Sequence, residues 1–416
     1  MSVTVIEGAR LIDPASGLDA EGRCVLEDGV IAAAGPEAPA PAGAQIIAAH
    51  GLILCPGLVD MMAFRYDNKA ALAGGITAIA LMPDQDPVLE NEAMITHAAR
   101  RSPGLVKVYP MGAATKGLAG TELAEIGLMA QAGAVAFTDG RNAIADAGLM
   151  RQVMRYVHHH GRILLHHAED PSLAAGGVMN EGETATRLGL AGVPVAAEAI
   201  LVDRDIRLAR LTGAALHFQL LSSAEAIAAL RAARSEGLPV SAGLSPPYFT
   251  LNETTVGTYR TFAKLSPPLR TEDDRRACVD AIADGTIGVI CSAHDPKDQE
   301  SKRLPFSEAA FGAIGFETLL PLTLALHHND GVPLMTLIRA MTETPARLLG
   351  LPGGRMSPGA PADLLLFDPD APATIAADRL LSEAKNTPFD GLPVQGRVER
   401  CFIDGRTVYQ RLEAAA

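Results

Sequence analysis

The sequence predicts an α/β protein built on a TIM (β/α)8 barrel, with a small β domain formed from both chain ends. Eight short apolar runs, rich in β-branched residues, alternate with longer amphipathic segments between Leu52 and Ile290. Strands that alternate with helices form parallel βαβ units, and eight such units close into a barrel. The chain has 416 residues, which is long enough for one barrel and a smaller appendage.

The eight strand-like runs follow one another through the barrel region, residues 52–352, and glycines mark many of the returns between them. The predicted strands are Leu52–Met61, Ile76–Met82, Val106–Met111, Ala134–Thr138, Arg162–His167, Ala215–Leu221, Pro239–Leu244 and Thr286–Cys291. Between them, Ala224–Ala233 has helical apolar spacing, and another helix is expected to start near Ala147.

The two flanks, residues 1–51 and 353–416, differ from the barrel region because they contain short strand-like runs separated by turn signals. Examples are Glu27-Asp28-Gly29 near the start and Cys401-Phe-Ile-Asp-Gly405 near the end. We expect the flanks to be two halves of one composite β domain that meet outside the barrel.

The composition of the chain argues against some classes of partner and indicates a cellular compartment. The net charge is −13 with no basic run, which argues against nucleic acid or an anionic membrane as a partner, since both require a positive surface. No apolar stretch is long enough to span a bilayer, and the N-terminus has no signal-peptide pattern. Five scattered cysteines without a C-x-x-C pair are typical of free thiols in a reducing cytoplasm.

In a TIM barrel the chemistry lies at the carboxyl ends of the strands, so the residues at those ends are the candidates for a site. The informative segments are Pro56-Gly-Leu-Val-Asp-Met-Met-Ala-Phe-Arg65, Met82-Pro-Asp84, Thr115-Lys-Gly117, Thr138-Asp-Gly140, His166-His-Ala-Glu-Asp-Pro-Ser-Leu173, Ser266-Pro-Pro-Leu-Arg270 and Ser292-Ala-His-Asp-Pro296. Taken in order along nearly the whole chain, they resemble dihydroorotase, the zinc enzyme that interconverts carbamoyl-aspartate and dihydroorotate in pyrimidine synthesis.

The resemblance also implies that the catalytic residues are lost. The two zinc-binding histidines of the family pattern P-G-x-x-D-x-H-x-H fall on Met62 and Phe64. A thioether is a poor zinc ligand and a phenyl ring is none. The family's sixth-strand histidine falls on Leu220, and its general-base aspartate falls on Ala293, which leaves no catalytic residue. The family's substrate-binding asparagine after Met-Pro falls on Asp84, and the asparagine of its N-P-P-L-R pattern falls on Ser266.

Five positions keep residues that match the family. Asp139 and His167 are vestigial candidates for metal ligands, although Asp139 could equally be a turn or helix-cap residue. Arg65, Arg270 and His294 are vestigial candidates for substrate binding. Two ligands do not make a zinc site, which needs three or four, so we expect no metal or other cofactor.

Some bacteria pair an inactive dihydroorotase homologue with aspartate carbamoyltransferase, and the resemblance implies that partnership here, in a cytoplasmic hetero-oligomer. An active zinc-dependent dihydroorotase or related cyclic amidohydrolase is the alternative, with a metal on Asp139, His167 and either His166 or Cys291. Strand alternation weakens that alternative, because it puts His166 and His167 on opposite faces. A metal-free binder of a small acidic metabolite is a third possibility.

Overall fold

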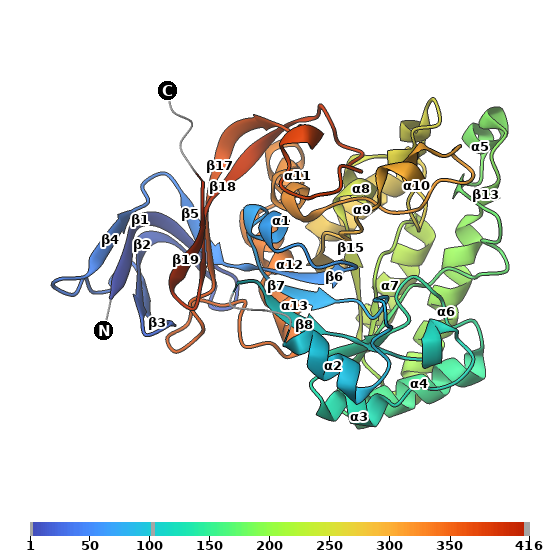
Figure 1. Cartoon of the computed structure of the whole chain (residues 1–416), viewed down its shortest axis with the longest axis horizontal. Helices are drawn as coiled ribbons and strands as arrows, with labels where there is room; N and C mark the ends of the chain where they lie inside the picture. The colour runs from blue at the N-terminus through green and yellow to red at the C-terminus, as the bar shows by residue number, and fades with distance from the viewer. Residues whose placement is uncertain (1–2, 101–104, 412–416) are drawn as a thin grey trace.

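The computed structural model describes residues 3–100 and 105–411, and these residues form a barrel with a separate sheet at one end (Figure 1). The sheet contains strands from both ends of the chain, so the predicted fold class is confirmed. Within the described residues, no helix has the length and apolar content needed to cross a membrane.

The barrel wall consists of eight parallel strand positions, because β8 and β9 are two pieces of the third strand. Its strands within the described ranges are β6 Leu58–Ala63, β7 Ile76–Leu81, β8 Lys107–Pro110, β9 Gly112–Ala113, β10 Ala136–Thr138, β11 Ile163–His166, β14 Leu216–Phe218, β15 Val240–Leu244 and β16 Val289–Ile290. The ring closes after β16, where Ala63 bridges His294 and the Phe64 N–H donates to the His294 carbonyl at 3.0 Å.

Helices cover the outside of the barrel, and several carry side-chain caps that explain where they begin. Asp67 caps the first helix, Asp146 caps α4 and Ser223 caps α7. The helices are α1 Asn68–Ala73, α2 Glu92–Ala99, α3 Ile126–Gln131, α4 Ala147–His159, α5 Glu183–Leu188, α6 Val195–Thr212, α7 Ala224–Ser235, α8 Pro246–Thr250, α9 Glu272–Ala283, α10 Gln299–Arg303, α11 Phe316–Asp330, α12 Leu334–Met341 and α13 Glu343–Leu349. The helices predicted near Ala147 and over Ala224–Ala233 are therefore present as α4 and α7.

The end sheet joins the two flanks of the chain in the order β19-β18-β17-β5-β1-β2-β3, with β4 paired to β1. Its strands are β1 Thr4–Asp13, β2 Leu18–Glu27, β3 Val30–Gly35, β4 Gln45–Ala48, β5 Ile53–Pro56, β17 Leu364–Thr374, β18 Pro393–Ile403 and β19 Arg406–Gln410. A two-stranded pair, β12 Met179–Asn180 and β13 Gly192–Val193, lies in the long connection after the fifth barrel strand.

The first predicted barrel strand, Leu52–Met61, is wrong in one respect, because it is two strands in the structure. β5 belongs to the end sheet, where Cys55 pairs with Leu365 of β17, and only β6 belongs to the barrel. The break falls at Gly57, where an added Cβ would lie 2.2 Å from Thr77 Oγ1. Only glycine leaves room for this close approach between the chain and the second strand.

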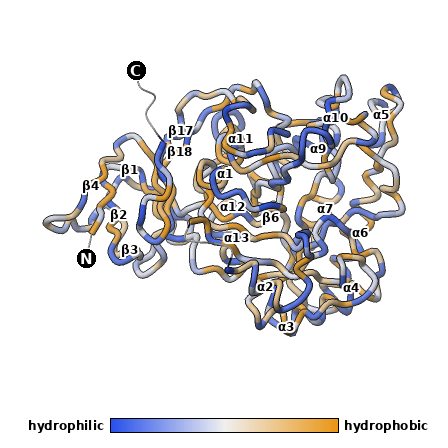
Figure 2. The backbone as a smooth tube through the Cα atoms, in the orientation of Figure 1, coloured by the Kyte–Doolittle hydropathy of each residue, from blue (hydrophilic) through white to orange (hydrophobic). Residues whose placement is uncertain are grey.

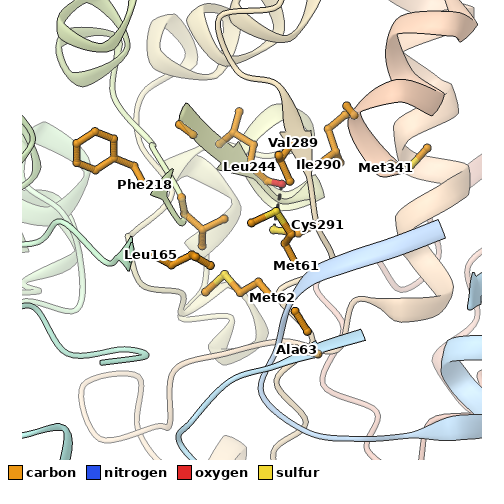
Figure 3. Packing of buried hydrophobic residues seen from close by; sticks show 14 of the residues in the cluster. Met61, Met62, Ala63, Leu165, Phe218, Leu244, Val289, Ile290, Cys291 and Met341 are labelled. Atoms are coloured by element: carbon orange, nitrogen blue, oxygen red, sulfur yellow. Dashed lines mark hydrogen bonds between the residues drawn. The ribbon is translucent and has the colours of Figure 1, made fainter. Parts of the chain in front are cut away.

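The barrel interior is packed with aliphatic, sulfur-containing and a few aromatic side chains. Figure 3 shows Met62, Leu165, Phe218 and Cys291 among the buried side chains of this cluster. In Figure 2 the outer helices alternate between hydrophobic and hydrophilic residues, as expected where one face packs on the barrel and the other meets solvent. A continuous apolar core therefore extends up to the strand ends where a site is expected.

Candidate site at the mouth of the barrel

The carboxyl end of the first barrel strand carries Met62 and Phe64, two residues apart, so both side chains point to the same side of the strand. Both line a cavity at the barrel mouth, together with Leu220, and all three are buried. The free space amounts to about 50 Å³, which is room for a few water molecules. Apolar side chains thus fill the side of the mouth where the resemblance places metal ligands.

Asp139 lies at the end of β10, and its carboxylate is hydrogen-bonded to the loop that follows β9. Its carboxylate accepts hydrogen bonds from the Ala114 N–H at 3.0 Å and the Thr115 N–H at 2.8 Å, and from the Thr115 hydroxyl. Burial raises its pKa, and the Thr115 hydrogen bonds oppose that rise. Asp139 therefore holds two strand ends together and is not a helix cap.

His166, the last residue of β11, and His167, which follows it, point in opposite directions, as the strand alternation predicts. His166 points to the helices: its Nδ1 lies 2.6 Å from Asp205 Oδ2 on α6, and its Nε2 accepts from the Ile144 N–H at 2.9 Å. His167 lines the mouth cavity, where its Nε2 lies 3.1 Å from Ser266 Oγ. Only one of the two histidines can therefore contribute to a site in the mouth.

Glu169 completes a small polar cluster with His167 and Ser266. Its Oε1 lies 3.7 Å from His167 Nε2 and 3.3 Å from Ser266 Oγ. Burial acts to raise the pKa of Glu169, but the His167 contact and the charge of Arg270 outweigh it, so the pKa is lowered. Glu169 and Ser266 both approach Nε2 of His167. In a catalytic triad, by contrast, the carboxylate and the hydroxyl contact different nitrogens of the histidine.

His294 and Ala293 occupy the turn after β16. The His294 ring stacks on Phe316 with centroids 3.8 Å apart, and its Nδ1 accepts from the Gly315 N–H at 3.2 Å. Burial lowers the pKa of His294 to about 3, so this ring is neutral at neutral pH. Ala293 lines the cavity with a backbone φ of +49°, a conformation that L-residues other than Asn and Asp rarely adopt.

The structure does not bring the three vestigial substrate-binding residues together. Arg65 is exposed outside the cavity lining, where its guanidinium donates to the Asp84 carbonyl at 2.9 Å. Arg270 is buried and donates to Asn180 Oδ1 at 2.9 Å and to the Val193 carbonyl at 2.7 Å, so it anchors the β12–β13 pair.

Arg141, which sequence analysis missed, closes the mouth from the loop after β10. Its Nη1 lies 3.2 Å from Asp84 Oδ2, its Nη2 lies 2.7 Å from Asp295 Oδ1, and its guanidinium stacks 3.8 Å from the centre of the Phe64 ring. Burial raises the pKa of Asp84, and the charge of Arg141 opposes that rise. The sequence held one signal for Arg141, namely that Asp84 replaces a family asparagine. A carboxylate at that position requires a nearby cation.

The donor atoms at this mouth do not fit the zinc that the family resemblance implies. Across residues 3–100 and 105–411, no three His, Cys, Asp or Glu side chains come together in a group that could hold a metal ion. His166 is turned to Asp205, and the Cys291 thiol lies 3.5 Å from the Leu244 carbonyl, with its pKa raised by burial. The rebuilt metal site of the alternative reading therefore lacks its third ligand, whereas the expectation that no cofactor binds stays a prediction.

Comparison with known proteins shows, as a first step, that this chain is similar to amidohydrolases. A family described as "Amidohydrolase family" matches residues 288–409, and one described as "Dihydro-orotase-like" matches residues 54–226. The dihydroorotases of Pelobacter propionicus and Syntrophotalea carbinolica are 40% and 41% identical to the chain, each over 98% of this chain and 99% of its own length. The chain belongs to the dihydroorotase family.

Solved structures agree with this fold. The L-hydantoinase (dihydropyrimidinase) from Arthrobacter aurescens superposes with a TM-score of 0.88 at 26% identity, covering 100% of this chain and 98% of that one. The dihydropyrimidinase from Brevibacillus agri superposes with a TM-score of 0.84 at 20% identity over 98% and 95% of the two chains. The second likeness concerns the fold alone.

Proposed function

We propose that this chain is a dihydroorotase-family protein that does not hydrolyse dihydroorotate, and that it serves as a non-catalytic partner subunit of aspartate carbamoyltransferase in a hetero-oligomer. One observation carries the first half of this proposal. Met62 and Phe64 stand where the family has two histidines, and they pack as buried apolar side chains against a mouth with little free space.

The reaction chemistry supports the same conclusion. Opening a cyclic amide draws on a metal-activated water and on a group that moves its proton. Ala293 cannot move a proton, and the donors near it do not fit a metal. His167 remains as a proton-transfer group in the cavity lining, and a positioned base alone supplies roughly 10²–10⁴-fold. We therefore expect turnover far below that of an intact site.

The partner role is supported by where the family resemblance survives. The residues that differ from the family pattern concentrate at the mouth, whereas the barrel wall, its helices and the end sheet are complete and well packed. A chain that has lost its catalytic residues but keeps its whole fold can still function by binding a partner through its outer surface. The named partner comes from the resemblance to inactive homologues.

The test combines three measurements on the purified full chain. Elemental analysis should find no stoichiometric zinc, and a dihydroorotate assay should find no turnover above background. Light scattering after size-exclusion chromatography should show a larger species when the chain is mixed with aspartate carbamoyltransferase. Unchanged elution of both proteins on mixing would exclude the partner role.

An active dihydroorotase or related cyclic amidohydrolase is the second candidate, and the comparisons favour it. The relatives that match the chain over almost its full length carry the name dihydroorotase. On this reading, the cluster of His167, Glu169 and Ser266 would supply the proton transfers. Zinc at one or more ions per chain together with measurable turnover would establish this candidate in place of the first.

A further inference from the structure

Three neighbouring helices on the outside of the barrel expose an unusual share of large apolar side chains. α4 packs against both α3 and α6, so the three helices present one continuous outer surface, which we call the α4 face (Figure 1). Leu128 on α3 is 47% exposed, Tyr156 on α4 is 52% exposed, and Ile200 and Leu211 on α6 are 52% and 67% exposed. Leu211 is the most exposed large apolar side chain among the described residues.

The same face is positively charged, although the chain as a whole has a net charge of −13. α4 buries Met150, Val153, Met154 and Val157 against the barrel and turns Arg151, Arg155, His158 and His159 outward. It contains no acidic residue from Ala147 to His159. On α6, Arg207 is exposed beside one exposed acid, Asp203.

Arg151, Arg155 and Arg207 form no ion pair with any residue that the structure describes, whereas several other surface arginines do. Arginine and tyrosine are enriched at protein–protein interfaces, and here they share one face with exposed leucine and isoleucine. The exposed apolar side chains distinguish this face from a nucleic-acid surface, where phosphate contacts dominate.

The α4 face also supplies a large part of the area that a specific interface needs. Its helices contain 6, 13 and 18 residues, which correspond to lengths of about 9, 20 and 27 Å. Helices packed side by side lie about 8–10 Å apart, so three of them extend roughly 25–30 Å across. At that spacing the three helices cover roughly 450–560 Å², more than half of the ~800 Å² that one partner contributes to a standard interface.

We infer that the α4 face is the docking surface for a partner subunit whose contacting surface is acidic opposite α4 and apolar opposite α3 and α6. The charge of α4 would orient the partner, while Tyr156 and the apolar side chains of α3 and α6 would be buried in the contact. This inference rests on the proposed partner role in one respect only, the choice of aspartate carbamoyltransferase as the probe protein.

The experiment compares two pairs of charge reversals in the full chain. Arg151→Glu with Arg155→Glu alters the α4 face. The control, Arg187→Glu with Arg355→Glu, makes the same change in net charge at two exposed arginines outside this face, neither of which forms an ion pair within the described residues. Binding to the transcarbamoylase is measured by titration at low and at high salt, and melting temperature checks that each variant is folded.

The α4 variant should bind at least tenfold more weakly than the control variant, and the gap should narrow at high salt because ions screen exposed charges. Tyr156→Ala should weaken binding by a similar factor without this salt dependence. Wild-type binding that survives both changes would overturn the docking surface and leave the partner role standing. Absence of wild-type binding would overturn both. Self-association through the α4 face, or equal binding of a DNA duplex, would overturn the docking surface alone.

Discussion

The guanidinium carbon of Arg141 lies over the Phe64 ring, 3.8 Å from its centre, and the same guanidinium pairs with Asp84 and Asp295 across the mouth of the barrel. Phe64 comes from the first strand, Arg141 from the loop after the fourth, and Asp295 from the segment after the eighth. One side chain therefore ties together three sides of the mouth and covers the apolar residue that replaces a metal ligand.

Replacing Arg141 should weaken the fold measurably. Arg141→Met leaves Asp84 and Asp295 with Lys297 as the nearby cation, 2.9 Å from Asp295. Removing one partner of a buried pair costs about 3–5 kcal/mol, and since the Arg141 side chain is 35% exposed we expect about 1–3 kcal/mol in urea unfolding. When Asp84 is already replaced by asparagine, Arg141→Met should lower the unfolding free energy by less, because only the Asp295 carboxylate then loses its partner. Equal losses in both backgrounds would contradict this account.

Met62 and Phe64 should behave as core residues. Phe64→Ala should lower the unfolding free energy by about 3–5 kcal/mol and Met62→Ala by about 2–5 kcal/mol, whereas Met62→Leu should cost less than about 1.5 kcal/mol. Added zinc should leave the melting temperature of the wild-type chain unchanged, since a ligand that binds the folded state would raise it. Small effects of both alanine variants, or a zinc-dependent rise, would show that the mouth is not an apolar core.

Restoring the family's general base should not restore catalysis. We expect Ala293→Asp to fold at least as well as the wild type, because aspartate tolerates the positive φ of this position better than alanine. Hydrolysis of dihydroorotate should nevertheless stay at background, since residues of a catalytic site act as a unit. A steady-state assay and a thermal melt test both statements, and turnover in this single variant would point to a working metal site.

Asp60 gives a prediction about pH. Burial raises the pKa of this carboxyl to about 6, while hydrogen bonds from Ser292 and Met62 act in the opposite direction. A raised pKa contributes stability that is fully present below the unfolded-state value of about 4 and is lost as the pH rises through 6. Compared with Asp60→Asn, the wild type should therefore lose up to about 3 kcal/mol between pH 4 and 7. Chemical unfolding of both proteins across this pH range tests the prediction. A difference in unfolding free energy that stays constant with pH would refute it.

The repeated strand-like runs predicted the barrel because buried parallel strands are continuous apolar segments, and this signal is local. The break at Gly57 is not local, since the run on both sides is apolar and the break depends on Thr77 and on β17 far along the chain. For the same reason the sequence predicted that Met62 and Phe64 stand at the family's histidine positions, but not which side chains pack against them. The Arg141 network joins loops whose spacing only the folded barrel determines.

The end sheet has a consequence for how this protein is made. Pro56 pairs with Leu364, so more than 300 residues must follow β5 before its neighbour β17 exists. At ribosomal rates of about 5–20 residues per second, this corresponds to roughly 15–60 seconds. During that time β5 has an open edge that could pair with another nascent chain. Completion of the C-terminal flank is therefore the event that closes this edge, and a ribosome that stalls before residue 364 leaves it exposed.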